Sequence, residues 1–179
     1  MSRGAARLHC DSPLTAKGKD QARQVGAILR GILPAAAAWK VVSSPLGRTR
    51  ATAEIVLGAL GRARDGYETD DRLRELDFGD WTGLRMADVE QERPAEWSAR
   101  AADPWNVPPP GGESYGQVAA RVAAWGAEQS GEVVAVAHGV VGRILRGVAL
   151  GLDGSGIRTL DEPQDCVFRI EGSKVDCIR

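Results

Sequence analysis

The feature that most constrains this chain is the apolar run Val133-Val134-Ala135-Val136-Ala137, which leads directly into His138 and Gly139. The run is rich in β-branched residues, is continuous rather than alternating, and follows Gly131. This pattern is typical of a strand that is buried on both faces of a sheet. Residues 133–142 also form the longest stretch without Asp, Glu, Lys or Arg, and it is too short to span a bilayer. We therefore expect an interior strand with His138 at its carboxyl end.

Helical spacing and strand patterns alternate along the rest of the chain. Residues 40–44 have the pattern of a second buried strand, and residues 73–81 fit either a short strand or an extended turn. The end of the chain reads as a hairpin around Gly172 and Ser173. The predicted helices cover about 15–33, 46–60, 86–97 with an interruption at Pro94, 114–129 and 140–150. This order predicts one three-layer α/β/α domain over residues 1–179 with a mainly parallel sheet.

The composition of the chain argues against several classes of function. The 179 residues carry a net charge of -1 and 43% hydrophobic residues, which is ordinary for a globular chain. We therefore expect no nucleic acid and no membrane as partners. The start of the chain does not read as a signal peptide, which favours a cytoplasmic setting. The wide spacing of Cys10, Cys166 and Cys177 fits neither a disulfide framework nor a zinc site.

Two strand-to-helix junctions place polar groups where open α/β sheets bind ligands, beyond the carboxyl ends of the strands. At the first junction, the strand passes through Pro45 into a helix whose first turn carries Arg48. At the second, the apolar run delivers His138 and Gly139 at the start of the next helix. A helix N-terminus favours anions, and a guanidinium can grip phosphate through two hydrogen bonds. The junctions together predict a phosphate-binding pocket.

A third candidate residue is Glu75, which stands among apolar residues in the segment 73–83. In such surroundings the pKa of a carboxyl can rise, so that it serves as a general acid. Each residue taken alone also has a simpler interpretation. His138 would be a packed side chain, Arg48 one of many surface arginines, and Glu75 a solvated loop charge.

Five segments considered together resemble the histidine phosphatase superfamily, also called the phosphoglycerate mutase-like family. They occur in the order of that family and cover most of the chain. The segments are Asp11-Ser12-Pro13-Leu14-Thr15-Ala16-Lys17-Gly18, Ser43-Ser44-Pro45-Leu46-Gly47-Arg48, Arg74-Glu75-Leu76-Asp77-Phe78-Gly79-Asp80-Trp81-Thr82-Gly83, Pro110-Gly111-Gly112-Glu113-Ser114 and Val136-Ala137-His138-Gly139.

The resemblance implies phosphoryl transfer to an active-site histidine, followed by hydrolysis, with no metal and no cofactor. By position, Arg48 resembles the arginine that holds the phosphate, and Glu75 resembles the proton donor to the leaving oxygen. His138 resembles the second histidine, which contacts the phosphoryl group, and Gly139 beside it allows close approach. The implied ligand is a small phosphorylated substrate or inorganic phosphate. Residues 82–112 would form a lid, and the shortness of this insertion favours hydrolysis over a mutase reaction.

One motif of the family has no counterpart here: Arg-His-Gly at the end of its first strand, roughly two dozen residues before Pro13-Leu14-Thr15. Only Met1 to Asp11 precede that point in this chain, and His9 has no strand pattern before it and no glycine after it. We therefore expect the acceptor histidine and the first strand of the sheet to be missing.

Two explanations of this difference stay open. A start that is set too late or a trimmed chain would make the intact protein an ordinary phosphatase, and we favour this reading because Arg48, Glu75 and His138 remain. Otherwise, the short form is a pseudophosphatase that binds phosphate or a phosphorylated ligand. In either case an uncovered strand edge would favour association into a homo-oligomer.

Overall fold

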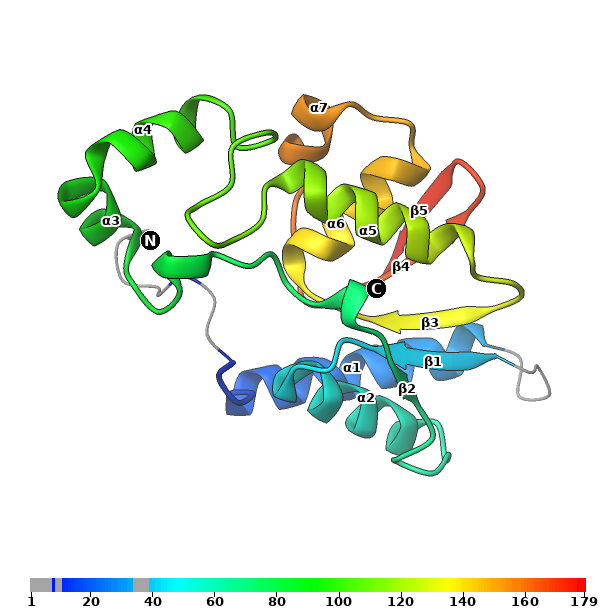
Figure 1. Cartoon of the computed structure of the whole chain (residues 1–179). Coiled ribbons are helices and arrows are strands. Elements are labelled where there is room, and N and C mark those ends of the chain that lie inside the picture. Colours follow the sequence, from blue (N-terminus) through cyan, green and yellow to red (C-terminus); the bar gives the residue numbers. More distant parts are fainter. Residues whose placement is uncertain (1–7, 9–10, 34–38) are drawn as a thin grey trace.

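A computed structural model describes Leu8 and residues 11–33 and 39–179, so the predictions made for His9 and Cys10 lie outside the described residues. Three parallel strands form the main sheet in the order β2-β1-β3 (Figure 1). These strands are β1 (Lys40–Ser43), β2 (Glu68–Thr69) and β3 (Val133–Val136). A separate antiparallel hairpin consists of β4 (Val167–Glu171) and β5 (Lys174–Ile178).

Helices cover both faces of the main sheet, which confirms the predicted three-layer α/β/α arrangement with its parallel strands. Helices α1 (Ala16–Ile32) and α2 (Gly47–Ala59) pack against each other on one face. Helices α5 (Tyr115–Ala127) and α6 (Gly139–Ala149) lie on the opposite face (Figure 1). Within the described residues, no helix is both long enough and apolar enough to cross a membrane.

Local hydrogen bonds explain why several helices begin where they do. The Thr15 hydroxyl accepts a bond from the Gly18 N–H at 3.1 Å and starts α1. Ser114 and Gln117 form a reciprocal capping box at the start of α5. Asp153 caps α7 (Gly154–Thr159), a helix that the sequence patterns did not predict.

The segment from Leu73 to Trp81 forms no strand, so that alternative is wrong. Two short 3-10 helices stand at its ends instead, η1 (Asp71–Leu73) and η2 (Gly79–Trp81). The Asp70 carboxylate accepts the Arg72 N–H at 2.8 Å and so starts the first tight turn. The short strand β2, just before this turn, was not predicted.

The predicted interruption at Pro94 is confirmed, and a second helix, longer than predicted, begins at this proline. Helix α3 (Met86–Glu92) ends before it, and α4 (Pro94–Ala102) starts on it. Proline is suited to a first helical position because the missing N–H has no helical partner there. The two helices extend to one side of the sheet, within the segment predicted to form a lid (Figure 1).

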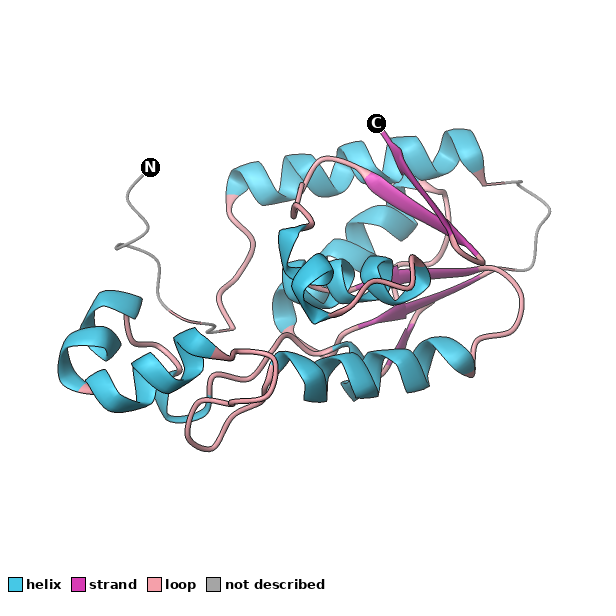
Figure 2. Cartoon of the chain, turned by 90° about the horizontal axis from the view of Figure 1, so that it is seen from above, coloured by secondary structure: helices cyan, strands magenta, loops and turns pink. Residues whose placement is uncertain are grey.

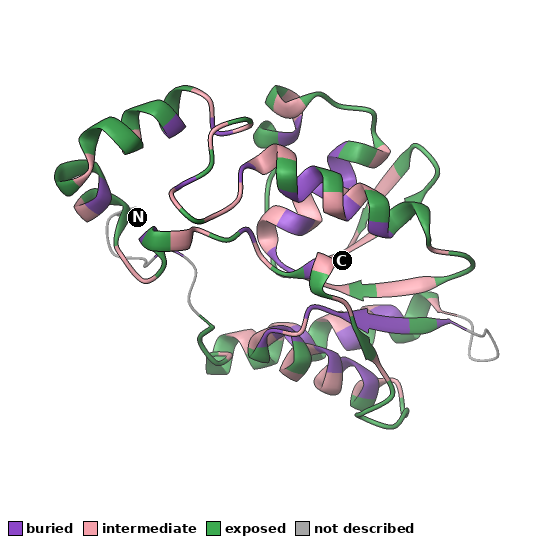
Figure 3. Cartoon of the chain, in the orientation of Figure 1, coloured by how far each residue is buried: buried purple, intermediate pink, exposed green. Residues whose placement is uncertain are grey.

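Strand β3 is less buried than its sequence predicts. Val133, Val134 and Val136 are half-buried and Ala135 is exposed, whereas Val41 and Val42 of β1 are buried (Figure 3). The prediction that both faces of β3 are buried is therefore wrong. The physical reason is that, among the residues the structure describes, β3 pairs with β1 along one edge and with no strand along the other, while β4 lies in a separate sheet (Figure 2).

Candidate functional site

The two predicted junctions meet at the carboxyl ends of β1 and β3. Their last residues, Ser43 and Val136, are register partners, so the residues that follow them emerge side by side. The Nε2 atom of His138 lies 2.8 Å from the Oγ atom of Ser44, and Ser44 is fully buried. The contact fixes the imidazole at the start of α6 against the end of β1.

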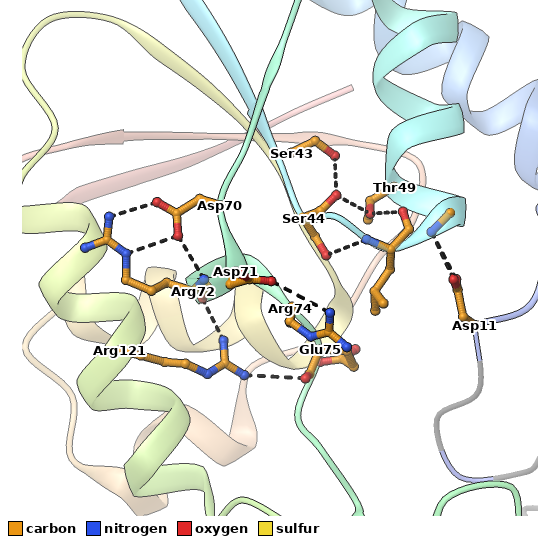
Figure 4. A network of polar contacts seen from close by, with 12 residues as sticks. Asp11, Ser43, Ser44, Thr49, Asp70, Asp71, Arg72, Arg74, Glu75 and Arg121 are labelled. Carbon is orange, nitrogen blue, oxygen red and sulfur yellow. Dashed lines mark hydrogen bonds and ion pairs between the residues drawn. The ribbon is translucent and has the colours of Figure 1, made fainter.

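Arg48 lies in the first turn of α2, where an anion-binding position is already occupied by a carboxylate. No side chain of the helix itself caps α2. Instead, both carboxylate oxygens of Asp11 accept the Gly47 N–H, at 3.1 and 3.2 Å (Figure 4). Asp11 also lies 3.9 Å from the guanidinium of Arg48. The combination of helix N-terminus and guanidinium therefore holds a negatively charged oxygen pair in this structure.

Glu75 follows η1 in a segment that Arg121 of α5 holds in place (Figure 4). The Arg121 guanidinium donates to the carbonyl oxygens of Arg72 at 2.6 Å and Glu75 at 3.4 Å. It also binds both carboxylate oxygens of Glu113 at 2.8 Å. This bidentate pair orients Arg121, so it fixes the backbone that presents Glu75.

Several groups around Glu75 act on its protonation. Burial raises the pKa of Glu75, and the neighbouring Glu162 carboxylate raises it further. The N–H groups of Leu76 and Val140 and the charge of Arg48 oppose the rise, but the net shift of the pKa is upward. A carboxyl that keeps its proton to a higher pH is suited to donate that proton to a leaving oxygen.

Glu162 is a residue of this site that sequence patterns did not indicate. A Cβ atom added to Gly139 would lie 2.6 Å from a carboxylate oxygen of Glu162, so the carboxylate rests against the start of α6. Arg143 forms an ion pair with Glu162 at 3.2 Å. The first turn of α6, like that of α2, is thus faced by a carboxylate.

The structure brings Arg48, Glu75 and His138 to the same end of the sheet. Arg48 and Glu75 interact electrostatically, and His138 joins them through Ser44 beside α2. A cavity of about 810 Å³ reaches His138 and Gly139, but neither Arg48 nor Glu75 lines it. The three side chains therefore lie at the same end of the sheet but do not line one common cavity.

Ser44, Arg121 and Glu162 are the residues that sequence reasoning did not single out. Ser44 could have been found, because it stands directly at the end of a predicted strand beside Pro45. No local pattern points to Arg121 or Glu162, because their partners lie far away in the chain.

Fold and site together define an α/β protein that gathers a guanidinium, an imidazole and a half-buried carboxyl at the carboxyl end of a parallel sheet. The model of the histidine phosphatase superfamily (branch 1) matches residues 2–176. The chain belongs to this superfamily.

Three relatives illustrate the similarity. "Probable phosphoglycerate mutase GpmB" of Salmonella paratyphi C is 35% identical over 167 residues, which are 90% of this chain and 74% of the relative. The crystal structure of the alpha-ribazole phosphatase from Shigella flexneri has a TM-score of 0.80 and 25% identity, and covers 98% of this chain and 87% of that one. The structure of a mycobacterial glucosyl-3-phosphoglycerate phosphatase has a TM-score of 0.70 and 30% identity. The match covers 87% of this chain and 76% of that one.

Proposed function

We propose that this chain is the phosphate-handling part of a metal-independent hydrolase of small phosphomonoesters that works through a phosphohistidine. The observation that carries the proposal is the gathering of Arg48, Glu75 and His138 at the ends of β1 and β3. Membership of the superfamily, with phosphatases among the similar structures, supports phosphatase-type chemistry.

Each residue has a role that its surroundings suit. Arg48 neutralises the phosphate oxygens, and His138 stabilises the negative charge that develops as the phosphoryl group moves. Glu75 in its protonated form gives its proton to the leaving oxygen as the bond from phosphorus to that oxygen breaks. The phosphoryl group passes to an acceptor imidazole. Glu75 as carboxylate then takes a proton from a water molecule whose oxygen bonds to phosphorus as the phosphorus–nitrogen bond breaks, which releases inorganic phosphate and frees the imidazole.

Among the described residues His138 is the only histidine, and it already has the role of stabilising the phosphoryl group. No described residue therefore remains to serve as the acceptor imidazole. The sequence contains two histidines, and His9 lies outside the described residues. This observation favours a second candidate function for the chain as given, that of a pseudophosphatase which binds phosphate or a phosphorylated ligand. Loss of a nucleophile lowers rates by many orders of magnitude, so we expect little or no turnover from the 179 residues alone.

Calorimetric titration with inorganic phosphate or vanadate tests the binding function common to both candidates. We expect Arg48→Met to weaken binding at least about tenfold, because it removes a charge-assisted bidentate donor. The matched control is Arg50→Met, since Arg50 is exposed on the same helix and bonds to the Tyr67 hydroxyl instead. Equal affinities of the two variants, or no binding of millimolar phosphate by the unaltered chain, would refute the proposal.

Acid-quench labelling with a phosphorylated substrate distinguishes the two candidates. The hydrolase predicts phosphohistidine on a form of the protein that includes the acceptor, together with a loss of turnover in His138→Ala. The pseudophosphatase predicts phosphate binding with neither label nor turnover in every form of the protein.

A further inference from the structure

The first turn of α6 has no capping side chain of its own, and a glutamate from a distant loop faces it instead. His138 stands at the N-cap position without a side-chain capping bond, and the first turn holds no acidic residue. Glu162 lies in the loop between α7 and β4, and its carboxylate rests against Gly139. The positive end of the helix dipole stabilises a carboxylate at this position. Glu162 thus lies where the proposed function places phosphate, beside His138 and Gly139.

The charges around Glu162 oppose one another. Arg143, one turn further along α6, forms the ion pair with Glu162 at 3.2 Å. Glu75 faces the same turn from the other side, because its carboxyl accepts the Val140 N–H and interacts electrostatically with Glu162. Two carboxylates at one helix start repel each other. Glu162 is therefore held there by Arg143 and the helix, against repulsion from Glu75 whenever Glu75 is ionised.

Arg143 has hydrogen-bond donors that its present partners leave unused. It is half-buried, donates to the Tyr115 hydroxyl at 3.2 Å and lies over the same ring at 5.6 Å. Within the described part of the chain, its Nε atom is nevertheless buried without a hydrogen-bond partner. A guanidinium carries several N–H donors and can bind a phosphate through two hydrogen bonds at once. A phosphate would therefore satisfy Arg143 better than the carboxylate of Glu162 does.

Glu162 can leave its position without the unfolding of any helix or strand. Its side chain is 35% exposed, whereas that of Arg143 is 14% exposed. The loop is anchored at the preceding residue, since Asp161 pairs with Arg146 at 3.1 Å. Rotation of the Glu162 side chain alone would move its carboxylate into water, while Arg143 stays beside the start of α6.

We propose that Glu162 is an internal competitor for the phosphate position at the start of α6, and that Arg143 passes from Glu162 to the phosphate when this competitor is displaced. The inference rests on the proposed function, because it concerns the same anion-binding position. It makes Arg143 a second guanidinium of the site beside Arg48. It also means that the affinity for phosphate is lower than the cationic groups of the site would give without Glu162.

Titration calorimetry of the 179-residue chain with inorganic phosphate tests both members of the ion pair. We expect Glu162→Gln to bind phosphate at least about fivefold more tightly, because a like charge leaves the site, and Arg143→Met to bind it at least about fivefold more weakly. A pair that only stabilised the fold would change the affinity in the same direction whichever member is replaced. Effects of the same sign, or an unchanged affinity in either variant, overturn the inference.

The ion pair between Arg169 and Glu171 on β4 is the matched control, since it joins the same two residue types at exposed positions. Arg169→Met and Glu171→Gln remove the same charges, so both should leave the affinity for phosphate within about twofold of the unaltered chain. Changes as large as those at Arg143 and Glu162 would show a general effect of net charge and contradict the proposed competition.

NMR of the arginine Nε–H groups follows the displacement itself. The signal of Arg143 is assigned by its absence from Arg143→Met. We expect this signal to shift when phosphate is added to the unaltered chain, because the guanidinium exchanges its partner. A signal that stays in place at saturating phosphate rules out the exchange of partners.

Failure of this inference and failure of the proposed function are distinguishable. Phosphate binding that depends on Arg48, but not on Glu162 or Arg143, would retain the function and remove the competitor. No binding of millimolar phosphate, either by the unaltered chain or by Glu162→Gln, would remove both.

Discussion

At the scale of single residues, the site brings together polar side chains that are shielded from water by their neighbours. Ser44 is fully buried against His138, and Glu75 lies between the charge of Arg48 and that of Glu162. A buried carboxyl with a raised pKa destabilises the folded state once it ionises. Function and stability are therefore linked at Glu75.

Replacing Glu75 by Gln should change how stability depends on pH. The folded state binds the proton of Glu75 more tightly than the unfolded state does, so its contribution is fully present below the ordinary pKa of 4.5. That contribution is lost as pH rises through the raised pKa. We therefore expect Glu75→Gln to gain stability relative to the unaltered chain between pH 4 and pH 7.5, as measured by urea unfolding. The exposed Glu90→Gln serves as control, and a constant difference for Glu75→Gln would contradict the linkage.

At the scale of elements, strand-to-helix junctions and one close contact between two loops determine where the site residues lie. In this loop crossing, Gly79 of η2 packs against the backbone of the loop at Pro110 and Gly112. The Asp80 N–H donates to the Pro110 carbonyl at 2.9 Å, and Glu113 donates to the Asp77 carbonyl at the same distance. The loop that carries Glu113 is thus fixed to the segment that follows Glu75.

Gly79→Ala should destabilise the protein by about 2 kcal/mol or more, because Gly79 has φ +52° and an added Cβ would collide with the Pro110 carbonyl. Gly126→Ala is the matched control. Gly126 lies in α5 with open space around it, so alanine there should stabilise by about 0.5–1 kcal/mol. Urea unfolding measures the free energy of unfolding of both variants. If both substitutions change it in the same direction, Gly79 is not in close contact with the Pro110 loop.

At the scale of the whole molecule, the α/β body is joined to the α3 and α4 region by the start of the chain. Leu8 exchanges two backbone hydrogen bonds of 2.8 Å with Gly83 and Leu84. Its side chain is buried in a cluster with Trp81 and Val89. Three chain residues later, Asp11 binds the first turn of α2. The amino-terminal segment therefore connects two regions that are distant in sequence.

Leu8→Ala should lower the free energy of unfolding by about 2–4 kcal/mol, because it leaves a cavity beside Trp81. Leu152→Ala is the control, since Leu152 is 38% exposed, and its effect should stay below about 1 kcal/mol. Equilibrium urea unfolding provides the comparison. If the two variants are equally stable, the start of the chain does not contribute to the joining of the two regions.

Much of this architecture was predictable because its causes are local. Thr15 and Ser114 cap their helices as their sequence contexts predict, and the strand ending at Ser43 leads into a helix that carries Arg48. The turn that begins at Asp70 and the continuation of the helix after Pro94 as far as Ala102 were not predicted. Short 3-10 turns and proline positions depend on one or two hydrogen bonds, which apolar periodicity does not reveal.

The amino-acid sequence by itself determined the helix faces, the strand-to-helix junctions and the residue types at the rim of the sheet, because spacing and capping act within a few residues. Only the tertiary structure decided that Asp11 occupies the start of α2, that Glu162 faces α6, and that β3 pairs with β1 alone within the described part of the chain. These features join residues far apart along the chain. Their positions follow from how whole elements pack, which no local pattern encodes.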